Sequence, residues 1–307
     1  MTAGQALRTL VSRGTLIVPG VYNALVGRMA QRLGFQALYL SGAATSASLA
    51  LPDVGLITLS EMAEEARRLA DAVEIPVLCD ADTGFGEAVN VERAVRVLEK
   101  AGVAGIHLED QELPKRCGHL SGKKLVPVTA MVSKIRAALA ARRDPSFLII
   151  ARTDARGVEG LDGAIARARA YVEAGADGVF PEALESLEEF ATFARAVPTL
   201  LVANMTEFGR SPALDLTTLA GLGYGIVLYP LSALRVALAA TRQALQELLL
   251  SGHTRALVPH MMTRQELYDL LDYTGYEERD RFYFTGKVAG PATAQRSEKQ
   301  PDEQQGR

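Results

Sequence analysis

Short apolar runs rich in β-branched residues recur along the chain, and polar residues follow each of them. The eight runs are Thr15–Gly20, Ala37–Gly42, Pro76–Asp82, Gly105–Asp110, Phe147–Asp154, Gly178–Ala183, Leu200–Asn204 and Gly225–Pro230. Runs that are apolar on both faces are typical of strands buried in a parallel sheet, because half-exposed strands alternate apolar and polar residues. The pattern therefore predicts eight parallel strands.

Segments with the apolar spacing of a helix lie between these runs. The clearest cover Leu59–Val73, Val91–Ala101, Ala130–Ala141 and Leu161–Ala174. Gly102 and Gly175 stand at the ends of two of them, where a helix C-terminus favours a left-handed residue. Eight strand-plus-helix units predict a protein of the α/β class, a (β/α)8 TIM-type barrel.

A six-stranded doubly wound sheet is the alternative, but it requires two of the eight runs to be misassigned. No Gly-x-Gly-x-x-Gly sequence follows the first run, so nothing favours dinucleotide binding. Beyond the last run we expect helices at Leu231–Leu250 and Thr263–Leu271, and then a disordered polar tail, Thr293–Arg307. The predicted organisation is a single domain of residues 1–292.

Composition excludes several classes of function. The 307 residues carry a net charge of −3, so a nucleic-acid partner is not expected. No apolar run approaches the roughly 18 residues that span a membrane, and Arg8 and Arg13 interrupt any signal-peptide core. Two cysteines exclude a disulfide scaffold and favour a reducing compartment. We expect a soluble cytoplasmic protein.

Chemistry is expected at the carboxyl ends of the strands, where TIM barrels carry their active sites. The polar residues at these ends are Ser41, Asp80, Asp82, Glu109, Asp110, Arg152, Asp154, Glu182 and Asn204. Few of them suit a hydrophobic core, so their convergence predicts an active site.

Asp80 and Asp82 are two residues apart on a strand, which directs both carboxylates to one face. They repel each other unless a cation lies between them or one is protonated. Without a Cys or His cluster nearby, hard oxygen ligands favour Mg²⁺, with Mn²⁺ as the other choice. Glu109 is placed to reach the same ion through water. The alternatives are that one Asp caps the next helix and that Glu109 pairs with an arginine.

The basic sequence Lys115-Arg116-Cys117-Gly118-His119 lies in an unusually long segment, Glu112–Val126, after the fourth run. Long loops at this face of a barrel are typical of lids. Cationic neighbours lower the pKa of a thiol, so we expect Cys117 to be reactive. The alternative is an inert cysteine in a solvated basic loop. Cys79, inside an apolar run, is expected in the core.

Three arginines, Arg152, Arg235 and Arg264, suit carboxylate binding, although each could also be a surface residue. Together with a metal they imply a small, highly anionic substrate. All seven lysines lie off the strand ends, which leaves a Schiff-base enzyme without a nucleophile. His107 has no spacing that is typical of a metal site.

Several motifs together resemble the isocitrate lyase/phosphoenolpyruvate mutase superfamily, from about Val18 to Tyr268. They are LYLSGAATSASLALPDVG, CDADTGFG, HLEDQ, PKRCGHLSGKKLV, ARTDARGVEGLD, FPEA, ANMTEFG, LYPLSALR and TRQELY. The Lys-Arg-Cys-Gly-His motif resembles the lyases of the superfamily rather than its mutases.

The resemblance implies a barrel whose last helix is swapped onto a neighbouring subunit, in a homotetramer. It also implies Mg²⁺ on Asp80 and Asp82, with Glu109 in the outer shell. The implied substrate contacts are Tyr39, Ser41, Gly42, Ala43, Cys117, Gly118, Arg152, Glu182, Asn204, Met205, Thr206, Arg235 and Arg264. Some relatives have a second glycine in place of Ala43. Phe180 and Leu228 match lyases that accept an extra methyl group.

The implied activity is Mg²⁺-dependent retro-Claisen cleavage of (2S,3R)-2-methylisocitrate to pyruvate and succinate, as in propionate degradation by the methylcitrate cycle. Cys117 is the expected general acid. Tyr39, made more acidic by cationic surroundings, is the candidate base. Alternatives are a lyase for isocitrate or 2,3-dimethylmalate, an oxaloacetate hydrolase, a phosphonate mutase, and a non-catalytic metabolite-binding barrel.

Overall fold

The computed structural model describes residues 1–285. The predicted tail at 293–307 and the predicted domain boundary at 292 lie outside the described residues. The chain divides into two compact units, Met1–Thr254 and a second that begins at Arg255. Among the described residues, no helix is both long enough and apolar enough to cross a membrane.

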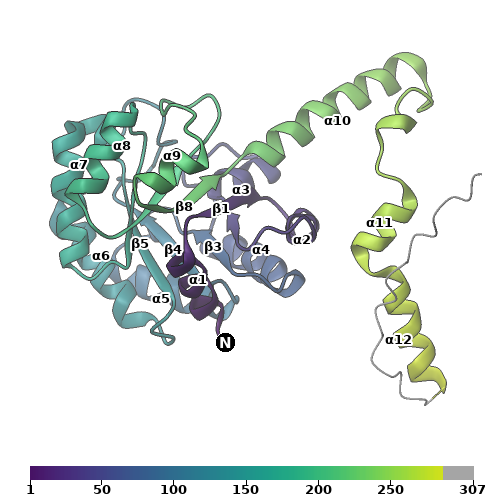
Figure 1. Ribbon diagram of the computed structural model, residues 1–307, viewed down its shortest axis with the longest axis horizontal. Helices are drawn as coiled ribbons and strands as arrows, with labels where there is room; N and C mark the ends of the chain where they lie inside the picture. Colours follow the sequence, from purple (N-terminus) through teal and green to yellow (C-terminus); the bar gives the residue numbers. More distant parts are fainter. Residues whose placement is uncertain (286–307) are drawn as a thin grey trace, which may run out of the picture. The chain divides into compact units, whose positions relative to one another are not determined.

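Eight parallel strands close into a barrel in which each strand pairs with the next and β8 pairs with β1. The strands are β1 Leu16–Val21, β2 Leu38–Leu40, β3 Val77–Asp80, β4 Gly105–Glu109, β5 Leu148–Thr153, β6 Gly178–Pro181, β7 Leu200–Asn204 and β8 Tyr224–Tyr229. Each falls within one residue of a predicted run or inside it. The predicted TIM-type α/β fold is confirmed (Figure 1).

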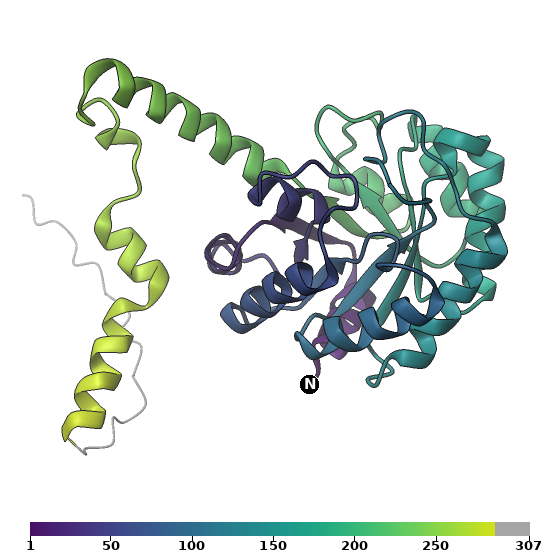
Figure 2. The ribbon, with the colours of Figure 1, turned by 180° about the vertical axis from the view of Figure 1, so that it is seen from behind.

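Most helices follow a strand and pack around the outside of the barrel, as Figures 1 and 2 show from opposite sides, whereas the first helix precedes β1 and the last helix of the first unit extends away from the barrel. In the first unit they are α1 Ala3–Arg13, α2 Ala24–Arg32, α3 Gly42–Ser48, α4 Leu59–Ala72, α5 Ala88–Lys100, α6 Val128–Ala141, α7 Arg156–Glu173, α8 Leu187–Ala196, α9 Leu216–Gly221 and α10 Ser232–Ser251. The second unit holds a 3-10 turn, Val258–His260, and helices α11 Arg264–Leu271 and α12 Tyr273–Thr285.

The six helices that the sequence predicts are all present. Gly102 and Gly175 have φ of 94° and 103°, which confirms their left-handed conformation after α5 and α7. Helix α7 begins earlier than predicted, at Arg156, because Gly160 (φ 77°) lies at a kink between two helical segments. The helical spacing that we recognised begins only after that kink.

Apolar side chains fill the barrel and the space between strands and helices. Val18, Leu78 and Ile150 belong to the inner cluster, which closes the barrel below the strand ends. Val95 and Ile135 belong to the layer between strands and helices. A packed interior of this kind leaves only the strand ends free to carry polar chemistry.

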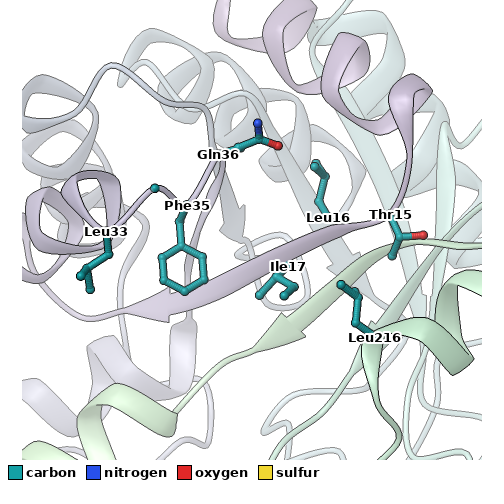
Figure 3. Close-up of a pocket in the computed structure, with 8 residues that line it drawn as sticks. Thr15, Leu16, Ile17, Leu33, Phe35, Gln36 and Leu216 are labelled. Carbon is teal, nitrogen blue, oxygen red and sulfur yellow. The ribbon is translucent and has the colours of Figure 1, made fainter.

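The outer face of β1 is less covered than the pattern predicts. Ile17 is 39% exposed, although strands of a (β/α)8 barrel are normally buried on both faces. Figure 3 shows Ile17 with Leu33, Phe35 and Leu216 around this open face. Of the residues of α10 only Leu234 is buried, so this helix leaves most of its apolar side chains exposed.

Candidate active site

Side chains from most of the strand ends and from the loop of residues 112–126 after β4, here called the lid, meet around one cavity. The predicted residues that line it are Tyr39, Ser41, Ala43, Asp80, Cys117, Gly118, Arg152, Phe180, Glu182, Asn204, Thr206 and Leu228. Its volume of about 50 Å³ has room for only a few water molecules. Entry of a larger substrate therefore requires the lid to open.

Asp80, the last residue of β3, is held from three directions. Its Oδ2 accepts hydrogen bonds from the Gly42 amide (3.1 Å) and the Tyr39 hydroxyl (3.2 Å), and its Oδ1 accepts one from the Asp82 amide (2.9 Å). A Cβ on residue 42 would lie 2.8 Å from Asp80 Oδ2 and 3.5 Å from Asp82 Oδ1. The two carboxylates thus share one small space, which only a glycine leaves free.

Lys115 reaches into this space from the lid. Its Nζ lies 2.8 Å from Asp82 Oδ1 and also contacts Asp53 Oδ1, and the residue is 3% exposed. The expectation that all lysines lie away from the strand ends is wrong for the ammonium group of Lys115. Burial acts to lower its pKa, but Glu109, Asp82 and the other carboxylates outweigh burial and raise it. The amine stays protonated, so it provides no Schiff-base nucleophile.

The acidic residues differ in their readiness to ionise. Burial opposes ionisation of Asp80, but His107, Lys115 and Arg152 outweigh it and lower its pKa. Burial and repulsion from Asp80 raise the pKa of Asp82. Burial also raises the pKa of Glu109 well above its usual range. A cation among such crowded carboxylates stabilises their ionised forms.

The donor set fits an open oxygen-ligand site. Glu109 Oε1 is buried and has no hydrogen-bond partner within residues 1–285. In the same part of the chain, no group of three His, Cys, Asp or Glu side chains is arranged to hold a metal ion by itself. Mg²⁺ is commonly held by one or two carboxylates and completed by water and substrate, which Asp80 and Asp82 can supply.

Arg152, at the end of β5, is the cation of the opposite wall. Its Nε lies 3.0 Å from Asp154 Oδ2 and 3.3 Å from Glu109 Oε2, and its Nη2 lies 3.3 Å from Glu182 Oε2. The alternative that Glu109 pairs with an arginine is therefore realised. Burial opposes ionisation of Glu182, but Arg152 and His119 outweigh it and lower its pKa.

Cys117 faces the cavity with a protonated thiol. Burial raises its pKa, and Glu182 adds to that effect. The expected lowering of this pKa is wrong, because burial outweighs the hydrogen bond from the His119 backbone and the charge of Arg152, which both act to lower it. The basic side chains beside Cys117 in the sequence are engaged elsewhere: Lys115 contacts two carboxylates, and His119 Nε2 lies 2.9 Å from Glu182 Oε1. A thiol that keeps its proton at neutral pH is suited to a general acid rather than to a nucleophile.

The lid is held against the barrel by His119 and Lys123, for which the sequence alone predicts no role. His119 Nδ1 accepts a hydrogen bond from the Arg210 amide (3.0 Å). Lys123 Nζ lies 2.9 Å from Asp154 Oδ1 and also binds the Gly118 carbonyl. The sequence does carry one signal for these contacts: the lid is rich in cationic residues, and the strand ends are rich in carboxylates.

Tyr39 does not have the acidity that we expected. Burial and the nearby Asp80 carboxylate raise its pKa well above its ordinary value, and Arg152 only partly opposes them. The prediction that cationic surroundings make it more acidic is wrong. The phenol keeps its proton and donates a hydrogen bond to Asp80 Oδ2.

Residues from β7 and the following loop complete one wall. Asn204 Nδ2 donates to Glu182 Oε2 at 3.1 Å, and Thr206 lines the cavity. Arg235 lies beside Thr206, with its Nη1 3.3 Å from Thr206 Oγ1, but its guanidinium is paired with Glu207 Oε2 at 2.7 Å. It is next to the cavity rather than in its wall.

Two predicted residues are placed elsewhere, and a third belongs to the second unit. Met205 packs into the outer apolar cluster. Asp110 lies behind the strand ends, where it accepts hydrogen bonds from the hydroxyls of Thr153 and Tyr171, both at 2.8 Å. Arg264 is the first residue of α11 in the second unit, and its role as a substrate contact stays a prediction.

A closed parallel barrel with a charged cavity at the carboxyl ends of its strands defines the chain as a TIM-barrel enzyme. Comparison with known families is more specific: the model of the phosphoenolpyruvate phosphomutase family matches residues 7–249. The chain belongs to this phosphoenolpyruvate mutase/isocitrate lyase superfamily, which confirms the resemblance seen in its motifs.

Individual relatives cover nearly the whole chain. A protein from Aeropyrum pernix named 2-methylisocitrate lyase is 54% identical over 278 residues, 90% of each chain. A solved 2,3-dimethylmalate lyase is 35% identical with a TM-score of 0.86, covering 94% of this chain and 99% of its own. A phosphonopyruvate hydrolase solved with oxalate and Mg²⁺ is 33% identical with a TM-score of 0.84, covering 92% and 100%.

Proposed function

We propose that this enzyme cleaves (2S,3R)-2-methylisocitrate to pyruvate and succinate by a retro-Claisen reaction. The observation that carries the proposal is that Cys117, with its protonated thiol, lines the same cavity as Asp80, whose carboxylate shares a small space with that of Asp82. That combination offers a cation site for one half of a substrate and an acid for the other. The name of the relative from A. pernix supports the same substrate.

We further propose Mg²⁺ as the cofactor, held by Asp80 and Asp82 with Glu109 reaching it through water. The Mg²⁺ with which the related phosphonopyruvate hydrolase was solved and the crowded carboxylates of this chain support the choice. When bound, such an ion supplies a Lewis acid beside the hydroxyl and carboxylate that become pyruvate.

We assign the remaining steps, substrate binding and proton donation, to side chains of the protein. Asn204, Thr206 and Arg235 bind the carboxylates of the succinate half, which accumulate charge as the carbon–carbon bond breaks. Cys117 donates its proton to the carbon released on that side, and the proton that leaves the substrate hydroxyl passes through water to restore the Cys117 thiol when the lid opens, so no net proton is consumed. The lid holds Cys117 in place through His119 and excludes water while it is closed.

The proposal is tested by following pyruvate release with a lactate-dehydrogenase-coupled assay on a panel of hydroxy acids. We expect kcat/KM to be highest for 2-methylisocitrate. Isocitrate is scored separately by its release of glyoxylate. Because 2,3-dimethylmalate also yields pyruvate, its rate is compared directly, and a higher kcat/KM for it would replace the proposed substrate.

Removal of the metal is expected to abolish turnover. After dialysis against EDTA the rate should fall by more than about 100-fold, because charge on the pyruvate half is no longer neutralised. Addition of Mg²⁺, or of Mn²⁺, should restore it. Full turnover in metal-free buffer would contradict the role proposed for Asp80 and Asp82.

We also propose that the chain works as a cytoplasmic homotetramer with its last barrel helix exchanged between subunits. The open face of β1 around Ile17 and the exposed apolar side chains of α10 support this assembly. Light scattering should give four times the chain mass of 32.9 kDa.

A charge on the open face should break the assembly, because it would be buried without a partner. The Ile17→Asp variant is expected to dissociate into smaller species, whereas Ile17→Val should keep the mass of the wild type. A wild-type monomer, or a tetramer unaffected by the aspartate, would count against the exchange.

A further inference from the structure

His107 lies directly behind the proposed metal site, although nothing so far gives it a role. It belongs to β4 and is fully buried, with its ring edge against Phe180 at a centroid distance of 5.2 Å. Its Nε2 lies 2.8 Å from the Tyr39 hydroxyl and 3.7 Å from Asp80 Oδ1. Nδ1 has no hydrogen-bond partner in the described part of the chain.

The hydrogen-bond donors and acceptors of Asp80, Tyr39 and His107 determine which imidazole nitrogen of His107 carries the proton. Asp80 is a carboxylate and can only accept, so the single phenolic proton of Tyr39 is the one that points to Asp80 Oδ2. The Tyr39 oxygen is then an acceptor toward His107, which requires the imidazole proton to be on Nε2. Nδ1 carries the lone pair, which costs less to bury without a partner than an N–H donor does.

We propose that His107 is a positioning residue for the metal carboxylate, acting through Tyr39. The proton on Nε2 holds the Tyr39 oxygen, and the Tyr39 hydroxyl holds Asp80 Oδ2, in one directed series of hydrogen bonds. Asp80 is thereby presented in a fixed orientation before any cation arrives. The inference rests on the proposed function only in placing a divalent cation at Asp80.

The series explains two features that the proposed reaction leaves open. Tyr39 donates a hydrogen bond to Asp80, so its hydroxyl orients that carboxylate rather than acting as the base. A histidine at this position is also explained, because a purely apolar side chain would fill the space beside Phe180 but leave the phenol oxygen without a donor.

The test measures cation binding rather than turnover, with Mn²⁺ as the probe and no substrate present. His107→Phe keeps the ring and its contact with Phe180 but removes the N–H donor. We expect the Kd for Mn²⁺ to rise by about 10-fold, as for other outer partners of metal ligands. Tyr39→Phe should cause a similar rise, and His107→Gln, which keeps an N–H donor, should stay within about three-fold of the wild type.

A double-mutant cycle separates this role from a structural one. In the Tyr39→Phe background, His107→Phe should change the Kd by less than about two-fold, because its target is already absent. An equal rise in both backgrounds would overturn the proposal, as would an unchanged Kd in the single variants. Circular dichroism melting of each variant checks that the barrel remains folded.

The tautomer provides a readout that is independent of the metal. With only four histidines in the chain, selective ¹⁵N labelling resolves the ring nitrogens of His107 in the metal-free enzyme. We expect a proton on Nε2 and none on Nδ1. A proton on Nδ1 would overturn the proposal even if Mn²⁺ binds, whereas correct protonation in an enzyme that binds no Mn²⁺ would place the failure in the proposed cofactor.

Discussion

Replacing Cys117 by serine should lower kcat by about 10²- to 10⁴-fold, the range that general acid catalysis contributes. The serine hydroxyl is a far weaker acid than the thiol, so protonation of the succinate half becomes the slow step. Substrate binding depends on the arginines and the metal site, so KM should change by less than about three-fold. Steady-state kinetics of pyruvate release measure both quantities.

The second cysteine provides a matched control. Cys79 lies in the core of the barrel wall, and its thiol donates to the Asp80 carbonyl rather than to the cavity. Cys79→Ala should cost some stability but keep kcat within a few-fold of the wild type. If Cys117→Ser turned over at the wild-type rate, the thiol would have no part in the chemistry and the proposed mechanism would need another acid.

The barrel could be predicted because its signal is local. Each strand is an apolar run ending in polar residues, and the residues at those ends, such as Asp80, Arg152 and Glu182, do converge. The position of Asp110 behind the strand ends also follows from a local pattern. Adjacent residues at a strand end point to opposite faces, so a Glu109 side chain directed towards Arg152 implies an Asp110 side chain behind the wall.

The lid could not be predicted because long-range partners determine its conformation. Lys115 lies beside Asp82 and Asp53, and His119 beside Glu182, all of which are distant in the sequence. Basic residues next to Cys117 in the chain therefore say little about its pKa, which burial raises. The open face of β1 has a similar origin, since periodicity does not reveal how much of Ile17 the helices of the chain cover.

The largest effect on stability is expected at Arg152. Arg152→Met leaves Glu109, Asp154 and Glu182 in a buried site without their shared counter-charge. Removal of one partner from a buried ion pair costs about 3–5 kcal/mol, and the free energy of unfolding at neutral pH should fall by that amount. Turnover should be lost as well, because the cavity wall loses its cation. Urea unfolding at pH 7 measures the change.

A surface arginine serves as the control for Arg152. Arg156 pairs with Glu185 and Glu189 at the start of α7, where water screens the interaction. Arg156→Met should cost at most about 1 kcal/mol. A similarly small loss of unfolding free energy for Arg152→Met would show that its buried carboxylate partners do not need the charge of Arg152.

The pH dependence of the free energy of unfolding shows whether Arg152 stabilises the fold through its charge. Glu182 has a lowered pKa in the folded protein, so its ion pairs stabilise the fold above the unfolded pKa of about 4.3 and are lost as the pH falls through the lowered value. The wild type should therefore lose stability below about pH 4. The variant lacks that contribution already, and its carboxylates become neutral more readily, so the difference between the two proteins should narrow on acidification. A gap that stays constant from pH 7 to pH 4 would mean that Arg152 stabilises the barrel by packing rather than by charge.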